Sequence, residues 1–160
     1  MRAEEIMNRF FVAVRPTAVK EAAMAMRDEG VGIVCVCDGS HRPTGVLTDR
    51  DMAVRGCAEG LPAASTPVQV IMSDEPVTCQ LGDETSDVEE RMKQTGIGRM
   101  LVVDGAGRLV GVITLAEIWH YESPMSAGAV SRRITSREFR VDSAAGDSPA
   151  ISPDPHDATG

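Results

Sequence analysis

The sequence has few aromatic residues and no long hydrophobic run. Aromatic side chains make up 3% of its 160 residues, so aliphatic residues must fill the core that its 42% hydrophobic content allows. No apolar run reaches the roughly 18 residues of a membrane-spanning helix, and we expect no membrane partner. The N-terminus reaches Glu4 with no apolar stretch behind it. We therefore expect no secretory signal and a cytoplasmic protein.

Basic residues are scarce as well. Lys and Arg total 16 against 24 Asp and Glu, which gives a net charge of −8. Binding to nucleic acid depends on clustered positive charge, so we expect no nucleic-acid partner. The sequence also lacks a P-loop, an HExxH motif and a Ser/His/Asp set, and its histidines lie apart at positions 41, 120 and 156. We predict no catalytic residues and no enzymatic activity.

Cysteine is limited to four positions. Cys35 and Cys37 would lie on one face of a strand, about 7 Å apart along it, which is too far for an unstrained disulfide. Their spacing is not that of a zinc site, so we predict reduced, buried thiols and no metal. Cys57 follows a glycine near the end of a predicted helix, and the sequence leaves its redox role open.

An internal repeat is the main feature that the sequence does contain. Residues 26–52 align without a gap on residues 92–118, at a constant offset of 66 residues. The matched residues are Met26/Met92, Gly30/Gly96, Gly32/Gly98, Asp38-Gly39/Asp104-Gly105, Gly45-Val46/Gly111-Val112 and Thr48/Thr114. This density of matches at one offset indicates two copies of one supersecondary unit.

Each copy has the pattern of strand, helix, strand, strand and helix. The predicted elements of the first copy are 10–14, 16–30, 33–37, 45–47 and a helix from Asp49; those of the second are 76–79, 84–94, 100–103, 109–113 and 116–121. A short helix is expected near 66–72. We predict an α+β fold of two tandem β-α-β-β-α motifs, residues 1–62 and 63–122. Residues 123–160 are rich in Pro, Ser, Ala and Gly, and we expect a mostly disordered tail.

Each hairpin is followed by Thr-x-x-acid, as Thr48 with Asp51 and as Thr114 with Glu117. One interpretation is a capping box, in which hydroxyl and carboxylate satisfy backbone N–H groups of the next helix. The other is a ligand site, in which the hydroxyl donates to a phosphate and the carboxylate accepts from a ribose diol. Glu at the second of these positions suits the capping box, and the shorter Asp suits the ribose.

The duplication, the two Asp-Gly hairpins and the two Gly-h-h-Thr-x-x-acid segments (h, hydrophobic) together resemble a pair of cystathionine β-synthase (CBS) domains, over residues 5 to about 122. This resemblance implies two copies related by a pseudo-twofold axis, with clefts that hold adenosyl ligands in binding members. It implies a regulatory sensor of AMP, ADP or ATP, with S-adenosylmethionine and NAD less favoured. It also implies a homodimer acting on a protein effector that the sequence does not identify.

The family's ligand contacts can be carried over residue by residue. Thr48 and Asp51 match the phosphate and ribose ligands of the first copy, and Thr114 and Glu117 match those of the second. Ala13 and Thr78 lie in the first strands, where members hold adenine, and Arg99 resembles a basic residue that some members direct at phosphate. Glu117 departs from the usual Asp. The alternative is therefore a structural module whose clefts take no ligand.

Overall fold

The computed structural model describes residues 1–122, which form two compact units. Among these residues, unit 1 contains 1–10 and 77–122, and unit 2 contains 11–76. Each unit contains a sheet and helices in the predicted order, so the α+β fold with two repeats is confirmed. The predicted tail, 123–160, lies outside the described residues.

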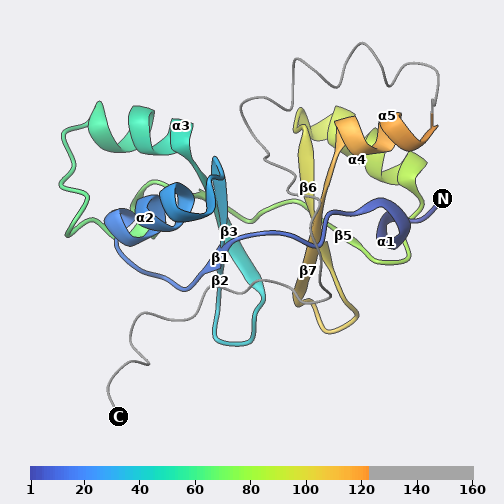
Figure 1. Ribbon diagram of the computed structural model, residues 1–160, viewed down its shortest axis with the longest axis horizontal. Coiled ribbons are helices and arrows are strands. Elements are labelled where there is room, and N and C mark those ends of the chain that lie inside the picture. Colours follow the sequence, from blue (N-terminus) through green and yellow to red (C-terminus); the bar gives the residue numbers. More distant parts are fainter. Residues whose placement is uncertain (123–160) are drawn as a thin grey trace. The chain divides into compact units, whose positions relative to one another are not determined.

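Unit 2 has a four-stranded sheet in the order β1-β2-β3-β4, in which only β1 and β2 run parallel. Its helices α2 and α3 lie on one side of this sheet (Figure 1). The elements are β1 (Ala13–Val14), α2 (Val19–Glu29), β2 (Ile33–Cys37), β3 (Pro43–Thr48), α3 (Asp49–Asp51), a π-helix (Met52–Cys57), a 3-10 helix (Val68–Val70) and β4 (Ser73–Asp74).

The sequence pattern explains the packing of unit 2. On α2, Ala22 and Met26 are buried four residues apart, as expected for one helical face. Gly30 ends this helix in the left-handed conformation, at φ 67°, which glycine adopts without steric cost. From the sheet, the core receives buried side chains from alternate positions of β2 and from β3, namely Val34, Val36 and Leu47.

Unit 1 repeats this arrangement with a three-stranded sheet in the order β5-β6-β7. The helices α4 and α5 again lie on one side of it (Figure 1). The elements are α1 (Ala3–Ile6), β5 (Thr78–Gln80), α4 (Thr85–Thr95), β6 (Arg99–Val103), β7 (Leu109–Thr114) and α5 (Leu115–Glu122). Met92 on α4 packs with Met100, Val102 and Ile113 of the sheet in one buried cluster.

The segment in front of each repeat packs with the other repeat. Asn8 pairs with Val112 at the edge of β7, and β4 pairs with β3 in the same way. In unit 1 a Cβ on Gly111 would lie 2.6 Å from the sulfur of Met7, and in unit 2 a Cβ on Gly45 would overlap the sulfur of Met72. The predicted motifs, 1–62 and 63–122, are thus sequence repeats, whereas the compact units contain exchanged segments.

Several local features differ from the sequence prediction. The strand expected at 10–14 is limited to β1, and the short helix α1 was not predicted. Hydrogen bonds from Ala3 N to Asp83 O (2.9 Å) and from Glu4 N to Leu81 O (3.1 Å) hold α1 in place. The helix expected from Asp49 widens into a π-helix after three residues, around the buried Gly56. The hydrogen bonds of α1 join residues distant in sequence, and a local pattern does not contain them.

Within residues 1–122, no helix is both long enough and apolar enough to cross a membrane.

Candidate functional site

The sheet register gathers the predicted site residues of each unit on one face. In unit 2, Ile33 pairs with Thr48 and Ala13 pairs with Cys35, two residues farther along β2. Residues two apart in a strand share a face, so Ala13 and Thr48 lie opposite the helix-packed side. They are two strand spacings apart across the sheet, about 9.6 Å. A ligand of nucleoside size, rather than direct side-chain contact, would connect them.

Unit 1 gathers its predicted residues in the same way. Arg99 pairs directly with Thr114, and Thr78 pairs with Leu101 on the same face. Residues directly opposite one another in an antiparallel pair have Cβ atoms about 5 Å apart. Arg99 therefore lies beside the threonine whose phosphate contact the family resemblance predicts, and it is partly buried there.

The first-repeat threonine and aspartate form a capping box. The Asp51 N–H donates to Thr48 Oγ1 at 3.2 Å, and the Thr48 N–H donates to Asp51 Oδ2 at 2.9 Å. The other carboxylate oxygen, Oδ1, faces Arg55 Nη2 at 3.8 Å. Among the described residues, the Thr48 hydroxyl donates to no protein acceptor. One hydroxyl proton and one carboxylate oxygen therefore remain available for a ligand.

The second-repeat box closes on itself more completely. The Thr114 N–H donates to Glu117 Oε2 at 2.8 Å, and the Thr114 hydroxyl donates to the same oxygen at 3.1 Å. The Glu117 N–H donates back to Thr114 Oγ1 at 3.2 Å. Burial raises the pKa of Glu117, against the lowering effect of its bonds from Thr114. The extra methylene of Glu thus lets its carboxylate accept a hydrogen bond from the Thr114 hydroxyl, whereas Asp51 accepts none from the Thr48 hydroxyl.

Arg91 is a residue of this region that the sequence analysis missed. Its Nη1 donates to Thr78 O at 3.0 Å, and its Nη2 lies 3.3 Å from Asp83 Oδ2. The matching residue of the first repeat is Ala25, which has no such donor. An arginine in the middle of a helix carries no sequence signal for this contact, because the contact depends on how α4 packs on β5.

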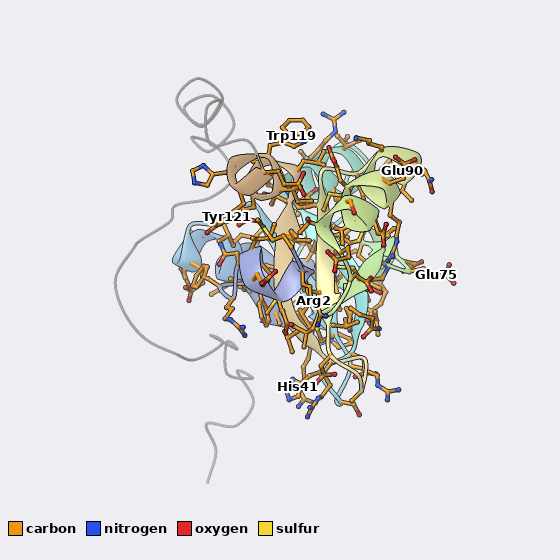
Figure 2. The ribbon with its side chains drawn as sticks, turned by 90° about the vertical axis from the view of Figure 1, so that its right-hand side faces the viewer. Arg2, His41, Glu75, Glu90, Trp119 and Tyr121 are labelled. Carbon is orange, nitrogen blue, oxygen red and sulfur yellow. The ribbon has the colours of Figure 1, made fainter. Side chains whose placement is uncertain are left out.

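Two of the four cysteines lie next to predicted site residues, Cys35 opposite Ala13 and Cys79 directly after Thr78. His41 lies at the tip of the β2–β3 hairpin (Figure 2), and the His120 ring packs edge-on against Tyr121. All four cysteines are free, and only Cys57 is exposed. Burial raises the pKa of Cys35 to about 12, and those of Cys37 and Cys79 to about 11. Within residues 1–122, no three or more His, Cys, Asp or Glu residues group as metal ligands.

Known sequences match both repeats. The CBS domain family model matches residues 3–55 and 68–118. The chain is 35% identical over 100 residues to the CBS domain-containing protein YhcV of Bacillus subtilis, covering 62% of this chain and 69% of YhcV. It is 29% identical over 119 residues to the Methanopyrus kandleri protein MK0525, covering 74% of this chain and 61% of that one.

A third relative is the Salmonella typhi arabinose 5-phosphate isomerase GutQ, 34% identical over 103 residues. This match covers 64% of the chain but only 32% of the isomerase. The chain therefore spans between about a third and two thirds of the length of several curated relatives.

Solved structures agree with this assignment. The Pyrobaculum aerophilum CBS domain protein PAE2072, solved with AMP, is 27% identical with a TM-score of 0.65, over 73% of this chain and 89% of that one. The cytosolic domain of the Mg2+ channel MgtE, solved with ATP, is 28% identical with a TM-score of 0.65, over 75% of this chain and 48% of that one. With a family model matched twice and this fold in each unit, the chain belongs to the CBS domain family.

Proposed function

We propose that the protein is a regulatory module that binds an adenosyl nucleotide of the AMP, ADP or ATP class, and that the first repeat is the binding-competent one. S-adenosylmethionine and NAD are less favoured ligands. In this assignment Thr48 donates to phosphate, Asp51 accepts from the ribose diol, and Ala13 marks the strand that holds adenine. No chemistry is performed on the ligand, so the protein acts as a sensor rather than an enzyme.

The observation that carries the proposal is that Thr48 retains a hydrogen-bond donor, and Asp51 an acceptor, that the capping box does not use. Their capping bonds use one lone pair of the hydroxyl and one oxygen of the carboxylate, and leave the Thr48 proton and Asp51 Oδ1 available. A ligand can therefore bind without breaking the helix cap. The AMP and ATP found in two similar CBS structures support the choice of ligand class.

The second repeat is proposed as a weaker site. The Thr114 hydroxyl donates a hydrogen bond to Glu117, and Arg91 donates one to the backbone carbonyl of Thr78. A nucleotide there would have to displace both bonds, although Arg99 would supply a positive charge for its phosphate. The same two bonds favour the alternative function, a structural CBS module, for this half of the chain.

Thermal unfolding with AMP, ADP, ATP, S-adenosylmethionine and NAD tests the proposal. A ligand at about 100 times its dissociation constant stabilises the native state by about 2.7 kcal/mol, so the melting temperature should rise by several degrees. Asp51→Ala should remove the rise, and Glu117→Ala, which deletes the equivalent carboxylate, should keep it. Absence of any rise in the wild-type protein would favour the structural alternative.

We also propose a homodimer that signals to a protein effector. Large apolar side chains remain exposed on the last helix of each repeat, with Val54 at 51%, Trp119 at 44% and Tyr121 at 51%. Trp119 points outward from α5 in Figure 2. Exposed apolar groups of this kind are typical of interaction surfaces. Light scattering on the samples used for thermal unfolding measures the assembly state.

A further inference from the structure

Arg55 connects Asp51, the residue proposed to bind ribose, to a part of unit 2 that is distant in sequence. One guanidinium nitrogen, Nη2, lies 3.8 Å from Asp51 Oδ1. The other, Nη1, donates to Ile71 O at 3.1 Å and to Ser73 Oγ at 3.4 Å. A planar guanidinium can make both sets of contacts at once because its donors point in fixed, divergent directions. Arg55 thus bridges the site and residues 71–73.

The segment that Arg55 reaches is the last part of unit 2 before the chain enters unit 1. Residues 68–74 contain the 3-10 helix and β4, and Ile71 is 1% exposed in the core. The chain passes from β4 through Pro76 to Val77, the first residue of the second part of unit 1. A change in the order of residues 68–74 would therefore act on the covalent link between the two repeats.

The contacts of Arg55 are suited to positioning rather than to holding the fold together. Its side chain is 50% exposed, and an ion pair this accessible contributes little to stability. Asp51 Oδ1 lies beyond hydrogen-bond distance of the guanidinium, so it can still accept a ligand hydroxyl while Arg55 compensates its charge. A ligand that fixes the carboxylate would also fix the arginine.

We propose that Arg55 is a positioning residue that couples ligand binding at Asp51 to the order of residues 68–74. This inference rests on the proposed function, because it requires a nucleotide whose ribose contacts Asp51. Coupling between two sites is reciprocal, so the segment, when ordered, strengthens nucleotide binding by the same factor.

The second repeat lacks this connection. The residue that matches Arg55 is Tyr121, whose side chain is 51% exposed and whose recorded contact is with the neighbouring ring of His120. Among the described residues, no cation lies within 4 Å of the Glu117 carboxylate. The coupling is therefore a property of the first repeat, the one whose hydroxyl and carboxylate are available for a ligand.

Hydrogen exchange of the full-length protein, with and without AMP, tests the coupling. In the wild-type protein AMP should slow amide exchange in residues 68–74 by about fivefold, the lower end of typical coupling. Arg55→Met should remove this protection and weaken AMP binding by a similar factor. Arg55→Lys keeps a positive charge near Asp51 but cannot bridge to residues 71–73, so it should still bind AMP, more weakly by the coupling factor, and lose the protection.

Arg27→Met is the matched control, because it removes an exposed arginine of the same unit whose partner is the adjacent Asp28. This variant should retain both binding and protection. If wild-type protein binds AMP and both Arg55 variants retain the protection, the coupling is wrong and the proposed function stands. If the wild-type protein binds no adenosyl nucleotide, the proposed function and the coupling fail together.

Discussion

The two repeats share a backbone and differ in how they use the same threonine. In both, a strand ends at Thr, a helix begins, and the acid three residues later completes a capping box. With Asp51 the Thr48 hydroxyl remains available as a hydrogen-bond donor. With Glu117 the longer side chain accepts a hydrogen bond from the Thr114 hydroxyl. One methylene thus separates a cap whose hydroxyl has no acceptor among the described residues from a cap whose hydroxyl donates to its own carboxylate.

The surroundings reinforce this difference. Arg91 donates to the first strand of the second repeat, where the first repeat has Ala25. Arg55 connects the first-repeat acid to a distant segment, where the second repeat has Tyr121. In each pair, an arginine stands in one repeat only. The duplication therefore preserved the packing and allowed the polar contacts to diverge.

The largest expected effect is a difference in stability between the same glycine substitution in the two repeats. At Gly111 a new Cβ would lie 2.6 Å from Met7 Sδ and 3.1 Å from the backbone Asn8 O, whereas at Gly45 the close atoms all belong to the Met72 side chain. A flexible side chain can move and a paired backbone cannot. We expect Gly111→Ala to cost about 1–3 kcal/mol of unfolding free energy and Gly45→Ala clearly less.

Urea unfolding of the two variants measures this difference. Equal losses would show that the exchanged segments yield equally. Met72→Ala in the Gly45→Ala background should recover part of the smaller loss only if contact with Met72 is its cause.

The next effect tests the role of side-chain length. Asp51→Glu gives the first repeat the acid of the second. The longer side chain should accept a hydrogen bond from the Thr48 hydroxyl while still completing the cap. We expect AMP binding to weaken about tenfold, or about 1.4 kcal/mol, by calorimetry. The melting temperature without ligand should change little. Unchanged affinity would show that the ligand does not use the hydroxyl.

The smallest effect concerns pH. Because burial raises the pKa of Glu117, the native state holds this proton more tightly than the unfolded chain does. Stability should therefore fall as pH rises from the ordinary Glu pKa, about 4.3, through the raised value. Glu117→Gln has no proton to lose there, so its melting temperature relative to wild type should increase over this range.

Glu89 offers a control of opposite sign. Hydrogen bonds from Trp119 and Lys93 lower its pKa, so its contribution is present at neutral pH and is lost on acidification. Glu89→Gln should therefore lose stability relative to wild type as pH rises. A parallel pH profile for Glu117→Gln and wild type would contradict the role assigned to Glu117 burial.

Much of the fold could be predicted because the signals are local. The continuous apolar run at residues 33–37, the helical spacing of Ala22 and Met26, and the glycine at position 30 each predicted an element that the structure contains. The two Thr-x-x-acid segments predicted both the caps and the candidate site. Arg55 and Arg91 could not be predicted, since each contacts backbone atoms more than ten residues away.

The sequence by itself determined the duplication, the order of the elements and the acid that follows each threonine, because these depend on residue type and short spacing. Only the tertiary structure decided which preceding segment completes each sheet, which threonine hydroxyl donates to its acid and which arginine donates to a backbone carbonyl. These outcomes depend on hydrogen bonds between groups that packing, rather than the order of the chain, brings together.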